Sequence, residues 1–279
     1  MSRVRALIIA SHPGPSLAIT ALASLLAAEA APRGTGPVLV APAMLALQLS
    51  IGWSNDAFDA ARDAAAGRAD KPVASGHIGT RPVWIAASVA LVASLAMALA
   101  IGPATFLITA VMAAAGWAYN GGVKSVLASG LTYLVGFGLI PAFATSTLPG
   151  HPWPRWQATA AAALVGLGAH FANTLPDLDG DRATGVRGLP QRVYARWGSG
   201  AVRACGLTLL LAASVLLLAA AAPARRWAAV AGLAAAACLA VVGARTSGRL
   251  PFFAAIGIAA IDVVLFAGGV ETLTGSALT

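Results

Sequence analysis

Charged residues are scarce in this sequence of 279 residues: they make up only 10% of it, whereas 58% of the residues are hydrophobic. Soluble globular domains carry about a quarter charged residues, so the composition excludes both a soluble domain and a disordered chain. Apolar stretches recur along the whole length, which also excludes a signal peptide followed by a soluble domain. With a mean hydropathy of +0.80, the sequence predicts an all-α integral membrane protein.

Cysteine is used only twice and acidic residues only ten times. Cys205 and Cys238 both lie in apolar runs, which favours neither a disulfide framework nor a thiolate metal site. The net charge of +8 would suggest nucleic-acid binding in a soluble protein. In a membrane protein the basic residues can instead set the orientation and bind lipid headgroups or phosphates, so we expect membrane lipid and no nucleic acid among the partners.

Apolar runs between proline, glycine and charge breaks predict nine transmembrane helices. We expect them at about 5–28, 36–59, 82–101, 104–120, 126–146, 156–176, 203–221, 226–244 and 251–270. No repeat or soluble insertion interrupts this series. The sequence therefore predicts one bundle of about nine transmembrane helices that forms a single domain over residues 1–279.

Basic residues are distributed unevenly between the predicted connections. If the N-terminus is cytoplasmic, four of the 18 Lys and Arg residues lie in outer segments and the other 14 in cytoplasmic ones. The outer residues are Arg33, Arg155, Arg225 and Arg226. The positive-inside rule therefore predicts a multi-pass protein of the inner (cell) membrane with a cytoplasmic N-terminus.

Seven of the ten acidic residues gather in two segments, which the predicted topology places on the cytoplasmic side. Each segment contains a row with the spacing N-xxx-D-xxx-D, one at the cytoplasmic end of the second predicted span and one at the end of the sixth. The rows are Asn55, Asp59 and Asp63, and Asn173, Asp177 and Asp181. On a continuous helix, residues four apart lie on one face, so we expect each row to present its side chains together.

Like charges four residues apart repel, so such rows need a cation nearby. Ligands with oxygen only, without cysteine or a histidine row, suit Mg²⁺, which completes its coordination with water and substrate phosphates. Two facing rows are therefore expected to hold two Mg²⁺ ions across a diphosphate. The loops after the rows add Arg68, Lys71 and Arg182, which suit a multiply charged phosphate. For either row alone, a solvated helix end paired with arginine is the simpler alternative.

At these residues the sequence resembles the UbiA-type intramembrane prenyltransferases. The first row matches their NDxxDxxxD motif, and Asp177 with Asp181 matches their DxxxD motif. The segment 71–78, KPVASGHI, is similar to the R-P-[IL]-P-S-G-x-[IL] segment that follows the first motif in many members. The resemblance covers essentially the whole chain.

The resemblance implies Mg²⁺-dependent transfer of a prenyl group from a polyprenyl diphosphate to a small acceptor, such as an aromatic quinone precursor, inside the membrane. It implies that the metal and diphosphate are held by Asn55, Asp59, Asp63, Asp177 and Asp181, the four aspartates being the catalytic residues. We expect the diphosphate to be contacted by Arg68, Lys71, Lys124 and Arg182. Secondary candidates are Asp56, Tyr119, Asn173 and Asp179.

The sequence departs from the family pattern at three positions. Tyr119 and Lys124 lie one residue further apart than in the common YxxxK spacing, Lys71 replaces an arginine, and Ala74 replaces a proline. Two polar residues inside predicted spans, His12 and Asp262, are explained equally well by a role in the site and by helix packing. The acceptor, the prenyl chain length, the oligomeric state and any protein partner have no recognisable short motif.

Two alternative functions remain at this point. One is transfer of a phosphosugar, of the phosphoribosyl type, onto a polyprenyl phosphate, which some relatives perform on the same scaffold. The other is a membrane transporter or cation-binding protein. Against the transporter, the acidic residues gather at one membrane face instead of mid-bilayer, and the sequence has no evident inverted repeat of broken helices.

Overall fold

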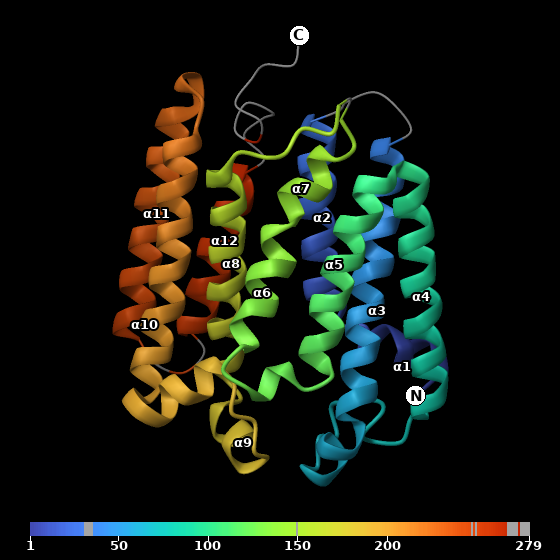
Figure 1. The fold of residues 1–279 in the computed structure, drawn as a ribbon. Helices are drawn as coiled ribbons and strands as arrows, with labels where there is room; N and C mark the ends of the chain where they lie inside the picture. Colours follow the sequence, from blue (N-terminus) through green and yellow to red (C-terminus); the bar gives the residue numbers. More distant parts are fainter. Residues whose placement is uncertain (31–35, 149, 247, 249, 267–272, 274–279) are drawn as a thin grey trace.

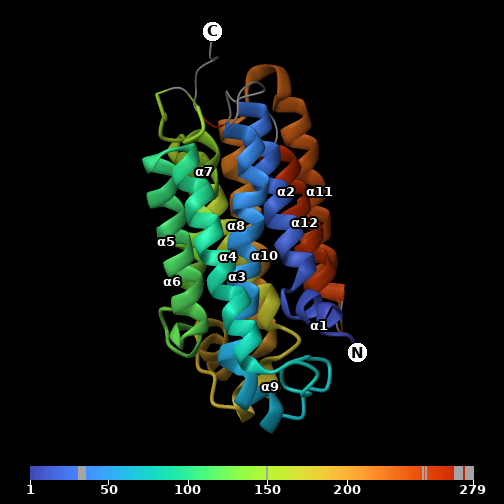
Figure 2. The ribbon, with the colours of Figure 1, turned by 90° about the vertical axis from the view of Figure 1, so that its right-hand side faces the viewer.

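The chain forms an elongated bundle of helices whose long members run roughly along one axis (Figures 1 and 2). The computed structural model describes residues 1–30, 36–148, 150–246, 248, 250–266 and 273, and it has no β-strand within them. In chain order the elements are α1 (Arg3–Ala10), α2 (Pro13–Ala30), α3 (Gly36–Ala65), α4 (Thr80–Ile101), α5 (Pro103–Asn120), η1 (Val123–Ser125), α6 (Ser129–Gly138), α7 (Ile140–Thr145), α8 (Trp156–Thr174), α9 (Leu178–Ala183), α10 (Leu189–Ala220), η2 (Pro223–Arg225), α11 (Arg226–Arg245) and α12 (Leu250–Phe266).

The predicted helical class is confirmed, and each predicted span contains helix over its described residues. Among these residues, four helices are long and apolar enough to cross a membrane, or five if the bent pair α1–α2 is one span. The number of nine crossings and the cytoplasmic N-terminus therefore remain predictions. Figure 1 places α1, the loop after α3 and α9 toward one end of the bundle, and the tops of α10 and α11 at the other.

Two of the predicted spans are broken. The first divides into α1 and α2, which meet at Ser11 and His12 with a bend of 60°. The fifth divides into α6 and α7 at Leu139. A proline follows each break, Pro13 at the start of α2 and Pro141 at the second position of α7, where its missing N–H leaves no intrahelical bond unmade.

The segment between α8 and α10 departs from one sequence expectation. The second acidic row spans a helix end, as expected: α8 ends at Thr174 and α9 begins at Leu178, because Pro176 lacks the N–H that a continuing helix needs. The seventh predicted span starts too late, since α10 begins at Leu189, 14 residues before 203. Its first turns escape a hydropathy search because they are basic, and Gly198, with a φ of 79°, kinks them away from the rest.

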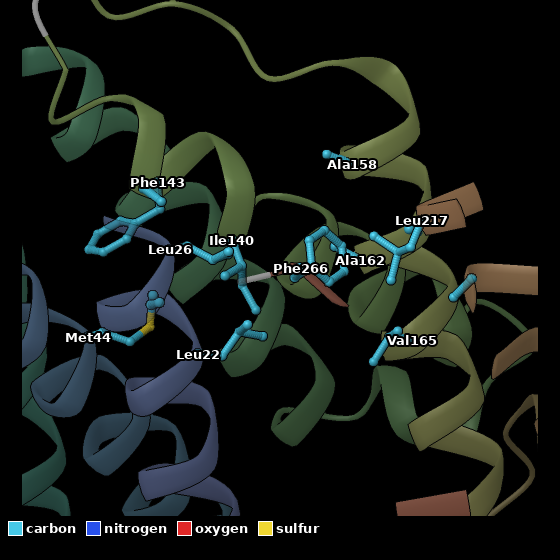
Figure 3. Close-up of a cluster of buried hydrophobic side chains, with 14 of the residues drawn as sticks. Leu22, Leu26, Met44, Ile140, Phe143, Ala158, Ala162, Val165, Leu217 and Phe266 are labelled. Carbon is cyan, nitrogen blue, oxygen red and sulfur yellow. The ribbon is translucent and has the colours of Figure 1, made fainter. Parts of the chain in front are cut away.

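The apolar core joins helices that are distant in sequence. Figure 3 shows Leu22 and Leu26 of α2 beside Ile140 of α7, and Leu217 of α10 near Val165 of α8. Close approach of these helices depends on small residues, as is common in membranes. At Gly166 of α8, an added Cβ would lie 2.5 Å from the Cβ of Phe137 and 2.7 Å from the carbonyl oxygen of Tyr133. This contact holds α8 against α6.

Replacing this glycine is expected to destabilise the bundle. Gly166→Ala forces α6 and α8 apart, and overpacking of this kind costs about 1–3 kcal/mol. Thermal unfolding of the detergent-solubilised protein measures the loss. Gly14→Ala is the matched control, because a Cβ there meets nothing within 4 Å. Equal melting temperatures for the two variants would contradict the close packing of α6 and α8.

Candidate active site

A cavity of about 540 Å³ extends into the bundle from the end that carries the acidic segments. Its walls come from α2, α3, α5, α6 and the segment from the end of α8 to α9. Charged side chains line one part and apolar side chains another. The apolar lining includes Ile19, Leu47, Ile51, Met112, Phe137 and Ile140. The cavity therefore has a polar part and an apolar part that communicate.

The first acidic row lies on one face of α3. The helix continues without a break to Ala65, so Asn55, Asp59 and Asp63 all face the cavity. The side chains of Asp59 and Asp63 are nevertheless almost fully covered, each residue being 5% exposed. Asp56 is 2% exposed and does not line the cavity. Its carboxylate contacts His12 and Lys71, at 2.9 and 3.0 Å.

Three cations neutralise the buried carboxylates of this row. Lys124 of η1 donates to Asp59, and Nη2 of Arg62 lies 2.8 Å from the other oxygen of Asp59 and 3.8 Å from Asp63 Oδ1. Nζ of Lys71 lies 3.0 Å from Asp63 Oδ2. Buried carboxylates are strongly unfavourable without such partners. The charge of the row therefore holds the loop after α3, which carries Lys71, and η1, which carries Lys124, against α3.

The two lysines respond differently to burial. Burial lowers the pKa of Lys71, but Asp56 and Asp63 outweigh this effect and raise it above the ordinary value. For Lys124, burial dominates and lowers its pKa, with only partial compensation by Asp59. Lys71 is thus the firmly charged cation of the pair, because it contacts two carboxylates.

The second acidic row faces the same cavity from α8 and α9. Asn173, Asp177 and Asp181 all line it. Oδ2 of Asp181 accepts a hydrogen bond of 2.7 Å from Gln191 Nε2, while burial raises the pKa of Asp181 above its ordinary value. Arg68, from the loop after α3, reaches to 4.0 Å from Asp177. The cavity therefore brings together the two rows that the sequence predicts.

Asn120 is a site residue that the sequence analysis missed. It ends α5, lines the cavity, and accepts a hydrogen bond of 3.0 Å from Asn55. Its own amide donates to the carbonyl of Ile51 and the hydroxyl of Ser54 at 2.9 and 2.8 Å. The available signal was a polar residue at the end of an apolar segment, directly after Tyr119. These bonds fix the side chain of Asn55 against α5.

Aromatic rings line the cavity beside the second row. Tyr119 contacts Tyr133 edge to face, with ring centroids 5.2 Å apart, and Phe137 stacks on Tyr133 at 6.0 Å. His170, which is 1% exposed, also stacks on Tyr133, at 4.5 Å, and hydrogen bonds to Ser129 at 3.0 Å. His170 does not line the cavity. It packs against the ring of Tyr133, which does line the cavity.

Some candidate residues lie outside the cavity lining. Asp179 accepts a hydrogen bond of 2.6 Å from the Tyr194 hydroxyl, and Arg182 is exposed on α9. Asp262 is fully buried in α12 and accepts from Ser214 at 2.6 Å. His12, in contrast, lines the cavity.

No three His, Cys, Asp or Glu side chains within the described part of the chain lie close enough together to hold a metal by themselves. The buried carboxylates of α3 are instead engaged with lysine and arginine, as described above. Any metal here has to take further ligands from water or from a bound substrate, which is how Mg²⁺ is commonly held.

The sequence model of the UbiA prenyltransferase family matches residues 16–265. No curated protein matches the chain significantly.

Solved structures share the fold at low sequence identity. A UbiA homologue from Aeropyrum pernix K1, in its apo form, is 19% identical with a TM-score of 0.67, covering 95% of this chain and 99% of that one. A UbiA homologue from Archaeoglobus fulgidus bound to DMAPP and Mg²⁺ is 15% identical with a TM-score of 0.70, covering 93% and 97%. Digeranylgeranylglyceryl phosphate synthase is 15% identical with a TM-score of 0.67, covering 96% and 99%.

The ion pairs of α3 give a testable difference in stability. Lys71→Met leaves Asp56 and Asp63 buried without a shared cation, and breaking such a buried pair is expected to cost about 3 kcal/mol. Arg68→Met removes a cation whose main partner, Asp70, is 64% exposed, so its effect should stay below about 1 kcal/mol. Denaturant unfolding in detergent compares the two. A larger loss of stability for Arg68→Met than for Lys71→Met would contradict the role of Lys71 as the shared cation of Asp56 and Asp63.

Proposed function

Since the chain belongs to the UbiA prenyltransferase family, we propose that it transfers a prenyl group from a polyprenyl diphosphate to a small acceptor in a Mg²⁺-dependent reaction within the membrane. The observation that carries the proposal is one cavity in which two acidic rows and four cations adjoin an apolar wall. A polyprenyl diphosphate has this same division into a charged head and an apolar tail.

Charge balance supports Mg²⁺ at the site, and we propose two ions. Among the described lining residues, four carboxylates (Asp59, Asp63, Asp177 and Asp181) face four cations (Arg62, Arg68, Lys71 and Lys124), so the protein charges cancel. A diphosphate ester brings roughly three further negative charges near neutral pH. The substrate therefore needs cations of its own, and oxygen ligands from the carboxylates together with phosphate suit Mg²⁺.

We assign the binding roles by position. Asn55, Asp59 and Asp63 on α3 and Asp177 and Asp181 on the other wall would hold Mg²⁺, which when bound neutralises the leaving diphosphate and so favours its departure.

The cations of the cavity are assigned to the diphosphate oxygens. Arg68, Lys71 and Lys124 line the cavity and are placed to contact them. We assign no direct contact to Arg182 or Asp179, because both lie outside the lining. Asn173 remains a candidate for the diphosphate, since it lines the same wall as Asp177.

The apolar part of the cavity supports binding of the prenyl tail. An apolar surface extends from the carboxylate rows and is formed by Leu47, Ile51 and Met112. A prenyl chain bound against this surface is shielded from water, which protects the reacting carbon. When the allylic C–O bond breaks, its electron pair leaves with the diphosphate and positive charge develops on the prenyl carbons. Tyr119 and Tyr133 both line the cavity, and aromatic rings at the wall of such a site stabilise positive charge.

The acceptor and the alternative functions are distinguished by turnover of different substrates. We propose a cytoplasmic opening, because the loops at this end carry most of the basic residues. Membership of a prenyltransferase family favours an enzyme over a transporter.

Purified protein is incubated with radiolabelled dimethylallyl or geranyl diphosphate and a panel of a hydroxybenzoate, a dihydroxynaphthoate and a glyceryl phosphate lipid. A parallel incubation contains a phosphoribosyl donor and a polyprenyl phosphate, and turnover of that pair in place of the first would contradict the proposal.

Loss of one metal-site carboxylate is expected to abolish transfer. Asp177 is 56% exposed, so Asp177→Asn should fold normally while losing at least about a hundredfold in rate, the usual scale for removing one charge-stabilising group. Radiolabelled product formation measures the rate, and the melting temperature reports folding. Asp262→Asn is the matched control, because α12 does not line the cavity. Near-native activity of Asp177→Asn would refute its role.

Ligand-induced stabilisation tests the metal separately from turnover. Geranyl diphosphate with Mg²⁺ is expected to raise the melting temperature, since a ligand at a hundred times its Kd stabilises by about 2.7 kcal/mol. Geranyl diphosphate with EDTA should stabilise much less, because the cavity charges already cancel. Equal stabilisation with and without Mg²⁺ would show that the diphosphate needs no metal here.

A further inference from the structure

The segment that joins α9 to the apolar part of α10 is strongly basic. Residues 182–203 contain five arginines and no acidic residue. Four of the arginines are exposed, namely Arg182, Arg187, Arg192 and Arg196. None of these four forms an ion pair within the described part of the chain, and none lines the cavity. Their charge is therefore not used by the carboxylates of the site.

Gly198 divides α10 into a short basic part and a long apolar part. Its φ of 79° kinks the first turns away from the rest of the helix, and glycine adopts this conformation without strain. Beyond the kink, residues 201–220 contain a single charged residue, Arg203. About 20 residues of this kind match the hydrocarbon thickness of a bilayer. The kink therefore lies near the boundary of the hydrocarbon, and the turns before it lie at the level of the headgroups.

Residues 187–197, here called the basic segment, have the composition of a helix that lies on a membrane surface. Arg192 and Arg196 are four residues apart and share one helix face, whereas Val193, on another face, is buried against the protein. Trp197 is 68% exposed, and tryptophan prefers the boundary between headgroups and hydrocarbon. Such helices bind anionic lipid surfaces, and each basic residue strengthens the association by about fivefold.

The basic segment also holds the second acidic wall. Nε2 of Gln191 donates to Asp181 at 2.7 Å, and the hydroxyl of Tyr194 donates to Asp179 at 2.6 Å. Both acceptors belong to α9, which is only six residues long. A helix this short is not stable on its own. The position of α9 therefore depends on the position of the basic segment.

The two ends of the basic segment have different surroundings. Its first residues are fixed by the protein: the N–H of Leu189 donates to the Ser129 hydroxyl at 2.8 Å, and an added Cβ at Gly188 would lie 2.4 Å from the carbonyl oxygen of Lys124. Its last residues, 195–197, are all exposed. The protein thus anchors one end, and the other end faces the surface of the bilayer.

We propose that the basic segment binds the headgroups of anionic phospholipids, and that bound headgroups stabilise α9 in its position through Gln191 and Tyr194. The partner is lipid phosphate, because the apolar span that follows Gly198 keeps the segment at the bilayer surface. The consequence for turnover rests on the proposed function. A better-ordered α9 keeps Asp181 facing the cavity, so anionic lipid raises the rate of prenyl transfer.

The experiment locates the lipid and follows α9 separately. Full-length protein is reconstituted in nanodiscs of phosphatidylcholine with or without phosphatidylglycerol. Either lipid is supplied in brominated form at the same mole fraction, and bromine quenches nearby tryptophan. The quenching of Trp197 is the difference between proteins with and without Trp197→Phe. Hydrogen exchange of α9 is measured in the same nanodiscs without bromine.

The test variant is Arg192→Gln with Arg196→Gln, and the matched control is Arg225→Gln with Arg226→Gln. The control removes the same charge from two exposed arginines that also precede an exposed tryptophan, Trp227. Its arginines lie at the start of α11, at the other end of the bundle from α9.

We expect brominated phosphatidylglycerol to quench Trp197 more strongly than brominated phosphatidylcholine in the wild type and in the control. The test variant should lose this difference, because its two arginines together account for a preference of about twentyfold. Phosphatidylglycerol should slow hydrogen exchange of α9 by about fivefold in the wild type and leave it unchanged in the test variant. Gln191→Leu should keep the quenching difference and lose much of the slower exchange, since it removes the hydrogen bond to Asp181.

Three results would overturn the inference. Equal quenching of Trp197 by the two lipids in the wild type would show that no anionic headgroup gathers at the basic segment. Loss of the difference in the control as well would assign it to net charge. Exchange of α9 that ignores phosphatidylglycerol would remove the link to the acidic wall. If quenching and exchange behave as expected but no nanodisc supports transfer from geranyl diphosphate, the proposed function fails and the lipid surface stands.

Discussion

Three almost fully buried aspartates on successive turns of α3 are the constraint on which the architecture of this end of the bundle depends. Carboxylates at 2–5% exposure cannot stay ionised without nearby cations, and α3 itself supplies only Arg62. The loop after α3 therefore folds back to place Lys71 between Asp56 and Asp63, and η1 brings Lys124 to Asp59. The two lysines of the sequence are both used here.

The two acidic walls differ in how their carboxylates are paired with cations. On α3 every carboxylate has a cation, and Asn55 is tied to Asn120 of α5. Opposite, Pro176 ends α8, and the side chain of Asp177 is 56% exposed, with its carboxylate 4.0 Å from Nη1 of Arg68. A prearranged wall facing an exposed one suits a substrate that arrives with its own metal ions, since the exposed wall can complete their coordination.

Patterns within one helix could be read from the sequence, whereas contacts between residues far apart in the chain could not. Hydropathy and the i, i+4 spacing act within one helix, so they located the helices and the row of Asn55, Asp59 and Asp63. The start of α10 at Leu189 was missed because its basic residues hide it from hydropathy. The pairing of Asn55 with Asn120, and of His12 with Asp56, joins residues 65 and 44 positions apart, and no local pattern encodes either.

The breaks in the predicted spans nevertheless carry information that hydropathy alone does not. Irregular backbone at membrane depth is tolerated only where it is buried in protein or borders a cavity. Both breaks fulfil this condition: His12 at the first break lines the cavity, as do Phe137 and Ile140 on either side of the second. A straight helix would satisfy more backbone hydrogen bonds at each place. The prolines that follow the breaks thus mark, in the sequence, two places where the helices border the cavity.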